Sequence, residues 1–119
     1  RTMSRIDWPR MGDTVEAGVP FTAYGIGFAG DRGISRVRVS PDGAATWLDA
    51  ELEDATFPPL AELSWVRWRV ELTIAEPGAA ELVVRATDGD GITQTGERTS
   101  ALPSGSTGWH RVEVVAVGA

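Results

Sequence analysis

Strict alternation of apolar and polar side chains over residues 65–74 is the clearest hydrophobic pattern in the chain. A period of two is typical of a β-strand with one buried face. Residues 81–87 repeat this alternation after the turn signal Pro77-Gly78, in which proline presets φ and glycine tolerates a positive φ. We therefore predict a long hairpin over residues 65–88, with an apolar inner face and a charged outer face.

Shorter alternating segments precede and follow this hairpin. We expect further strands at residues 4–8, 20–28, 34–40, 46–52, 92–95 and 109–117. Residues 53–64, which contain two consecutive prolines, are predicted to be a long crossover between two sheets. No segment has a convincing helical period. Short strands separated by turns, together with one long crossover, predict an all-β fold, an antiparallel β-sandwich of about seven strands.

The composition of the chain is that of an ordinary globular domain. With 119 residues, of which 42% are hydrophobic and 24% charged, the sequence is sufficient for one domain spanning residues 1–119. The net charge of −6 argues against nucleic acid as the main partner. Cysteine is absent, which excludes a disulfide or a thiolate metal site. No apolar run approaches the ~20 residues that a membrane-spanning helix needs, so we expect no direct membrane contact.

The residues that most often carry chemistry do not form a convincing site. His110 is the only histidine and lies in phase with the inward positions of the last strand, so we interpret it as structural. Asp88 and Asp90 lack the further oxygen ligands of a calcium loop and are interpreted as turn residues. Glu51 and Glu53 belong to an acidic edge rather than to a placed catalytic pair. We predict no catalytic, metal-binding or cofactor-binding residue in this chain.

Arginine side chains gather on the predicted outer face. In one register of the hairpin Arg69 lies opposite Arg85, and such a like-charge pair is unfavourable unless something acidic covers it. In another register Glu71 lies beside Arg85. We interpret this face as a candidate interface for another protein surface, with a solvated face as the alternative. The candidate interface residues are Arg36, Arg38, Trp65, Arg67, Arg69 and Arg85.

Residues 40–47 (SPDGAATW) resemble the Asp-box hairpin S-x-D-x-G-x-T-W, with Ala44 in place of the usual glycine. We expect Asp42 to accept hydrogen bonds from amides of the turn and Trp47 to pack beneath it. This hairpin recurs in sialidase propellers and in unrelated β-domains, so it predicts a local structure and no function. A propeller needs several blades, and one such hairpin in one small domain excludes it.

The order of several segments resembles one protein family. These segments are ISRVRVSPDG (34–43), TW (46–47), WVRW (65–68), PG (77–78), VRATD (84–88) and GWHRV (108–112). The series resembles the C-terminal dimerisation domain of the sulfite oxidase-type molybdopterin-dependent oxidoreductases, an immunoglobulin-like sandwich, over nearly the whole chain. The family motifs fall, as scaffold residues, on Asp42, Trp47, Trp68, Asp88, Trp109, His110 and Arg111. By alternation Trp109 and Arg111 share a face, so we expect a cation–π or packing contact between them.

The resemblance implies a non-catalytic accessory domain from the C-terminal part of a longer oxidoreductase. In that family the molybdenum–molybdopterin cofactor lies in a preceding catalytic domain, where a cysteine ligates it, so no cofactor is expected here. The domain packs on the catalytic domain and, in many members, forms a homodimer contact. Sulfite- and nitrate-processing members carry an oxyanion-binding arginine in the loop before Trp-His-Arg-Val, whereas residues 100–108 contain no arginine. That loop is closer to the bacterial branch, whose members are membrane-anchored or extracytoplasmic.

Two other classes of protein remain as alternatives. A free-standing immunoglobulin-like adhesion or carbohydrate-binding module would present exposed aromatic rings as a coplanar platform. Tryptophans that are buried or that face a protein would oppose this interpretation. An independent enzyme is the more distant alternative, and turnover of sulfite or of a glycoside by this chain alone would favour it.

Overall fold

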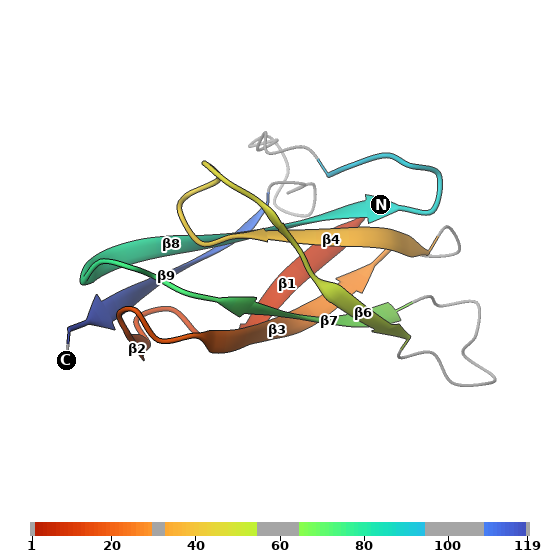
Figure 1. The fold of residues 1–119 in the computed structure, drawn as a ribbon. Helices are drawn as coiled ribbons and strands as arrows, with labels where there is room; N and C mark the ends of the chain where they lie inside the picture. Colours follow the sequence, from red (N-terminus) through yellow and green to blue (C-terminus); the bar gives the residue numbers. More distant parts are fainter. Residues whose placement is uncertain (1, 30–32, 55–64, 95–108, 119) are drawn as a thin grey trace.

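Two β-sheets packed face to face make up the computed structural model (Figure 1). The structure describes residues 2–29, 33–54, 65–94 and 109–118, apart from the side chains of Asp54 and Trp65. The strands are β1 (Met3–Trp8), β2 (Thr14–Glu16), β3 (Phe21–Phe28), β4 (Ile34–Ser40), β5 (Leu48–Asp49), β6 (Glu51–Asp54), β7 (Trp65–Leu72), β8 (Gly78–Asp88) and β9 (His110–Val117). The predicted all-β sandwich is confirmed. The described residues form no helix long and apolar enough to cross a membrane.

Strand pairing is antiparallel in both sheets except at one edge. The four-stranded sheet has the order β1-β3-β7-β6, and the five-stranded sheet has the order β2-β9-β8-β4-β5. The exception is the short edge strand β2, which runs parallel to β9. The strands β2, β5 and β6, which lie at edges of the two sheets, are only two to four residues long. Short edge strands offer few free backbone groups to another chain.

The hairpin predicted over residues 65–88 is wrong, because its two halves lie in opposite sheets. β7 pairs with β3 and β6, whereas β8 pairs with β4 and β9. Figure 1 shows β7 (green) and β8 (teal) in different layers. Both strands keep their predicted apolar faces, which meet in the same core. Alternation determines which face of a strand is buried but leaves open which strand lies beside it.

The chain changes sheets earlier than the sequence predicts. The strand expected at residues 46–52 is split into β5 and β6, which belong to different sheets on either side of Ala50. The amide of Ala50 donates to the carbonyl of Val37 at 2.9 Å, which anchors this switch point. β6 then pairs with β7 in the same sheet, so the predicted crossover over residues 53–64 is wrong. Residues 55–64 themselves lie outside the described part.

The turn after β8 is closed by Asp88. Its buried carboxylate accepts hydrogen bonds through Oδ1 from the amides of Asp90 at 2.9 Å and Ile92 at 3.0 Å. The Asp-Gly segment is thus a turn, as expected. The strand predicted at residues 92–95 is absent from its described part, where a single bridge joins Thr93 to β8.

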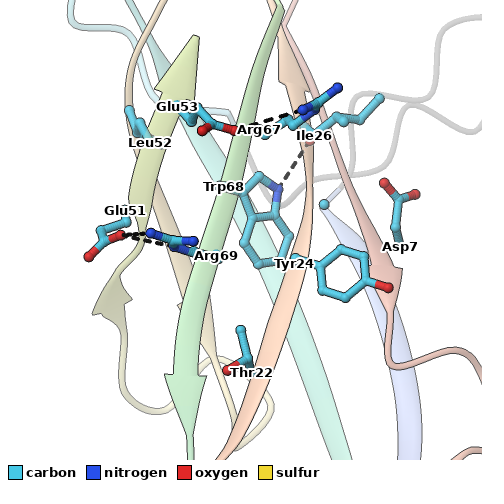
Figure 2. A pocket seen from close by; sticks show the side chains of 11 residues that line it. Asp7, Thr22, Tyr24, Ile26, Glu51, Leu52, Glu53, Arg67, Trp68 and Arg69 are labelled. Atoms are coloured by element: carbon cyan, nitrogen blue, oxygen red, sulfur yellow. Dashed lines mark hydrogen bonds and ion pairs between the residues drawn. The ribbon is translucent and has the colours of Figure 1, made fainter. Parts of the chain in front are cut away.

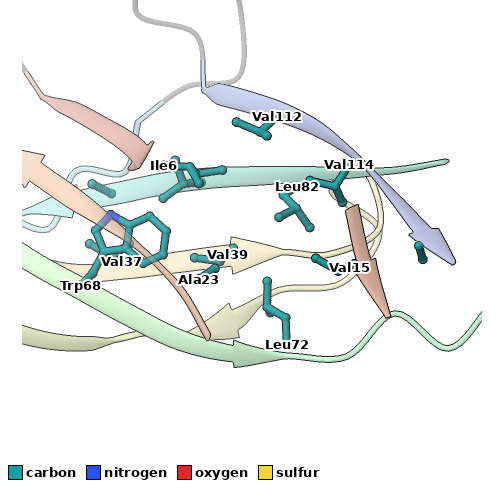
Figure 3. Close-up of a cluster of buried hydrophobic side chains, with 13 residues drawn as sticks. Ile6, Val15, Ala23, Val37, Val39, Trp68, Leu72, Leu82, Val112 and Val114 are labelled. Carbon is teal, nitrogen blue, oxygen red and sulfur yellow. The ribbon is translucent and has the colours of Figure 1, made fainter. Parts of the chain in front are cut away.

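Apolar side chains from both sheets fill the space between them (Figure 3). The core cluster consists of Ile6, Val15, Ala23, Val37, Val39, Trp68, Leu72, Leu82, Val84, Ala86, Val112, Val114 and Ala116. Trp68, the largest of these side chains, is 1% exposed and donates from Nε1 to the carbonyl of Ile26 at 3.2 Å. Gly25 lies directly over this ring, where a Cβ would come within 2.7 Å of Cζ2 of Trp68. Trp68 beneath Gly25 is thus the largest of several side chains that the four-stranded sheet contributes to the core.

Candidate functional site

The turn at residues 40–47, here called the Asp-box turn, has the hydrogen bonds to Asp42 that its motif predicts. Asp42 accepts hydrogen bonds from the Thr46 amide at 2.9 Å and the Thr46 hydroxyl at 2.6 Å. The Ser40 hydroxyl donates to Asp42 at 2.7 Å and accepts from the Ala44 amide at 2.8 Å. The Thr46 hydroxyl, followed by Ser40 and the Thr46 amide, lowers the pKa of Asp42. Ala44, where the motif usually has glycine, has a φ of 80°, a conformation that favours glycine.

The Asp-box turn lies against the outer face of the five-stranded sheet. The Gly43 amide donates to the carbonyl of Glu81 on β8 at 3.0 Å. Val83 is fully buried although alternation places it on this outer face, and it does not belong to the core between the sheets. Its neighbours across the strands are Ser40 and Arg111. A small second layer of packing therefore lies on the outside of this sheet.

A cluster of two tryptophans and an arginine forms the centre of this layer. Cζ of Arg85 lies 3.9 Å from the ring centroid of Trp47 and 5.6 Å from that of Trp109. The two indoles meet edge to face, with centroids 5.1 Å apart and planes at 79°. Trp109 also donates from Nε1 to the carbonyl of Gln94 at 2.9 Å. Cation–π contacts of this kind contribute ~0.5–2 kcal/mol each, so the Arg85 guanidinium is held in one place.

Arg111 extends the cluster along β9. Its Cζ lies 5.8 Å from the Trp109 centroid, as expected from the shared face of these two residues. Its Nη1 forms an ion pair with Glu81 Oε1 at 2.8 Å. Arg111 thus has both an aromatic and an acidic neighbour.

Arg85 has no such acidic neighbour among the residues that the structure describes. In the pairing of β4 with β8 it lies directly opposite Arg38, and like charges in this position destabilise a sheet. Its Nε is buried without a hydrogen-bond partner among the described residues. Burial, followed by the charge of Arg38, lowers the pKa of Arg85. Asp49 lies beside Arg38 at 3.1 Å but forms no ion pair with Arg85.

The other two predicted arginines do not share this face. Since β7 belongs to the other sheet, Arg67 and Arg69 lie on the outer face of the four-stranded sheet (Figure 2). Arg69 forms an ion pair with Glu51 at 2.9 Å, and Arg67 forms one with Glu53 at 3.8 Å. The expectation of one continuous arginine face is therefore wrong, because it rested on the hairpin. The side chain of Trp65 lies outside the described part.

The four-stranded face has its own hollow, of about 650 Å³ (Figure 2). Tyr24 and Leu52 contribute its exposed apolar surface, at 49% and 37% exposure. The ring of Tyr24 stacks on that of Trp8, with centroids 6.4 Å apart. The arginines that line this hollow are paired with Glu51 and Glu53, and the third carboxylate of its lining, Asp7, forms an ion pair with Arg5 at 2.7 Å.

His110 connects the two sheets at the start of β9. Its Nδ1 accepts a hydrogen bond from the Ile6 amide of β1 at 2.9 Å. Partial burial and then the charge of Arg5 lower the pKa of His110, and Asp7 opposes them. A neutral imidazole with Nδ1 as acceptor is the geometry of a structural histidine.

The residues of this chain do not fit the molybdenum cofactor that the resemblance implies for the neighbouring catalytic domain. A thiolate ligand is expected, and the chain has no cysteine. The described residues also contain no group of three or more histidines, aspartates or glutamates that could hold a metal ion.

Sequence reasoning missed the contact between Trp47 and Arg85, the centre of the cluster. The sequence indicated where each of the two residues lies by itself, since the Asp-box motif positions Trp47 beside its own turn and alternation directs Arg85 outward. The missing information was that β4 pairs with β8, which brings the two residues together.

Two packed β-sheets, one of which carries a cation–aromatic cluster on its outer face, define the class of the domain as a β-sandwich. The chain matches the family model of the Mo-co oxidoreductase dimerisation domain over residues 2–117, and it belongs to that family.

Curated relatives agree with this assignment. The chain is 31% identical to the mitochondrial sulfite oxidase of Rattus norvegicus over 121 residues, covering 96% of this chain and 22% of that protein. It is 32% identical to the mitochondrial sulfite oxidase of Homo sapiens over 117 residues, covering 93% of this chain and 21% of that protein. The chain therefore spans about a fifth of the length of these relatives.

Two solved structures share the fold. The sulfane dehydrogenase SoxCD of Paracoccus pantotrophus has a TM-score of 0.64 at 20% identity, over 99% of this chain and 33% of that chain. The SrpA adhesin of Streptococcus sanguinis has a TM-score of 0.54 at 15% identity, over 99% of this chain and 59% of that chain. At these identities the likeness concerns the fold alone.

Proposed function

We propose that the chain is the C-terminal accessory domain of a molybdenum-cofactor oxidoreductase of the sulfite oxidase type. In this role it packs on the catalytic domain, contributes to the contact between two subunits and carries out no chemistry itself. The family match over residues 2–117 is the observation that supports this function most strongly. The sulfite oxidase relatives support the class of the whole protein.

The arginine faces are the surfaces that we propose for these contacts. One is the outer face of the five-stranded sheet, with Arg36, Arg38 and Arg85. The other is the outer face of the four-stranded sheet, where Arg67 and Arg69 lie on the same strand as Trp65. Arginine and tryptophan are enriched among residues that dominate binding energy at protein interfaces. The Trp47–Arg85–Trp109 cluster supports the five-stranded face as the more important of the two.

Sedimentation equilibrium of the 119-residue chain across a concentration series tests the dimerisation part of this proposal. A dimer that dissociates in the micromolar range would support a self-contained dimerisation surface. A strict monomer would contradict such a surface and leave packing on the catalytic domain as the main role. The wider proposal would fail if the reading frame upstream of Arg1 encoded no molybdopterin-binding domain.

A free-standing adhesion or carbohydrate-binding module is not favoured. Trp68 is 1% exposed and belongs to the core. Trp47 and Trp109 cross at 79° and enclose Arg85, so they do not form a coplanar platform for a sugar.

A further inference from the structure

A hollow of about 390 Å³ opens beside Arg85 on the outer face of the five-stranded sheet. Its lining consists of Ser35, Arg36, Arg38, Arg85, Thr87, Gly91 and Thr93. We call it the arginine hollow. It presents three guanidinium groups, and its described lining contains no carboxylate. Its hydroxyls already form hydrogen bonds within the chain, because Ser35 donates to the carbonyl of Asp88 at 2.8 Å and Thr87 and Thr93 bond to each other at 2.8 Å. Guanidinium forks recognise carboxylates and other oxyanions.

The positive charge of the arginine hollow is only partly balanced within the described part of the chain. Asp49 lies 3.6 Å from Arg36 and 3.1 Å from Arg38, so one carboxylate serves two arginines. Arg85 has no ion pair with a described carboxylate, and its buried Nε has no hydrogen-bond partner. The hollow therefore keeps a positive charge on a chain whose net charge is −6.

The arrangement is rigid where a ligand would bind. The Arg85 guanidinium contacts two indole rings, with Cζ 3.9 Å from the centroid of Trp47 and 5.6 Å from that of Trp109. A side chain that is already ordered loses less conformational entropy on binding. The sheet also tolerates Arg38 opposite Arg85, an unfavourable pair that an acidic group would stabilise.

We propose that the arginine hollow receives carboxylate side chains from an acidic surface of the second subunit of the dimer. This inference rests on the proposed function and names the chemistry of one of its contacts. Each water in the liquid occupies about 30 Å³, so one small ion would fill only a fraction of a hollow of about 390 Å³. The opposite face is not suited to this role, because Arg67 and Arg69 already pair with Glu53 and Glu51.

Hexaglutamate peptide is a suitable probe, with hexaglutamine as the matched neutral peptide. Two-dimensional NMR of the isotope-labelled chain at low salt resolves the Nε–H signals of individual arginines. We expect saturable shifts at Arg36, Arg38 and Arg85 with hexaglutamate, none with hexaglutamine, and none at Arg69. We also expect the affinity to fall as salt is added, because ions screen charges at a surface.

Two matched variants sharpen this test. Arg38→Gln removes one charge from the arginine hollow and should weaken hexaglutamate binding about tenfold. Arg67→Gln removes one charge from the opposite face and should leave the affinity within about twofold. Equal losses in the two variants, or equal shifts on both faces, would overturn the inference, since they would indicate attraction by overall charge.

Inorganic phosphate separates a partner's carboxylates from a free ion. If phosphate shifted the three arginine signals and hexaglutamate did not, the hollow would be a small-ion site and the inference would be overturned. A chain that dimerises without binding hexaglutamate would also overturn it, while leaving the proposed function intact. Hexaglutamate binding by a chain whose gene encodes no molybdopterin-binding domain would overturn the proposed function alone.

Discussion

The two outer faces of the sandwich carry arginines in opposite electrostatic situations. On the four-stranded face Arg67 and Arg69 are exposed, and each has its own glutamate from β6. On the five-stranded face Arg85 is stacked on indole rings and lies opposite Arg38. In the first arrangement the charge of each arginine is balanced by a glutamate of the same chain. The second keeps in an ordered position a charge that no described carboxylate balances, and this is the observation on which the proposed contact rests.

The difference shows that alternation alone does not assign a role to an outward-facing arginine. Exposed ion pairs contribute only ~0–1 kcal/mol to stability. Substitution of the paired residues on the four-stranded face should therefore change the free energy of unfolding little. Arg85, in contrast, is held by a turn, two tryptophans and a second layer of packing. Its position depends on long-range contacts. Substitutions that remove those contacts should therefore distinguish the contributions of the two faces to stability.

The largest effect is expected beneath the four-stranded face. Trp68→Ala removes the largest buried side chain of the core and should lower the free energy of unfolding by about 3–5 kcal/mol, as for other buried aromatic residues. Urea unfolding monitored by circular dichroism measures this change. Trp47→Ala is the matched variant on the five-stranded face, and it should cost less because its ring is only partly buried. Equal losses would mean that the outer layer is as important for stability as the core.

A smaller effect is expected in the Asp-box turn, which positions Trp47. Asp42→Ala removes the acceptor of three hydrogen bonds, from Thr46 and Ser40, and should cost about 1–3 kcal/mol of unfolding free energy. The indole signal of Trp47 in NMR should shift at the same time, because the turn that positions this side chain is disrupted. An unchanged signal would show that Trp47 is held by Arg85 without help from the turn.

Ala44→Gly is the matched change in the opposite direction. The φ of 80° at Ala44 is strained for a side chain with a Cβ, so glycine should stabilise the folded turn. Glycine also makes the unfolded chain more flexible, and the net gain should be about 0.5–1 kcal/mol. A loss of stability would mean that the Ala44 methyl makes contacts that outweigh the strain.

The faces of strands were predictable from the sequence, and so was the Asp-box turn. Alternation placed Val37, Val39 and Trp68 inside and Arg36 and Arg38 outside, as observed. These properties depend on neighbours in sequence, because a period of two and a short hydrogen-bonded turn are local. The cation–π contact between Trp109, directly before β9, and Arg111 on β9 was predictable for the same reason.

Strand neighbours were not predictable, and neither was the cluster that depends on them. β7 and β8 are consecutive and each has one apolar face, which fits a hairpin as well as two strands that face each other across the core. The choice is made by β3, β4 and β9, whose edges hydrogen-bond with these strands. As a result Arg85 has Arg38 as its neighbour, and the arginines divide between two faces.

The link between the sheets at His110 should respond to pH. Burial lowers the pKa of His110 below that of the unfolded chain, near 6.5, so the unfolded state binds more protons below this pH. Stability should therefore fall as the pH decreases through about 6.5, by up to about 1 kcal/mol for the lost Ile6 hydrogen bond. Urea midpoints above and below this pH measure the change. His110→Asn keeps an acceptor that does not titrate, and a pH dependence equal to that of the parent would exclude His110 as its cause.

The smallest and most specific test compares one arginine from each face. Arg69→Gln removes an ion pair with Glu51 at 2.9 Å and should lower stability by about 0.5 kcal/mol. Arg38→Gln loses contact with Asp49 but also removes the charge opposite Arg85, so stability should stay within about 0.3 kcal/mol of the parent or rise. Urea, which is uncharged, keeps these effects unscreened during unfolding, and high salt should reduce both. If Arg38→Gln were the more destabilising variant, the charge on the five-stranded face would already be balanced within the chain, and the contrast between the two faces would disappear.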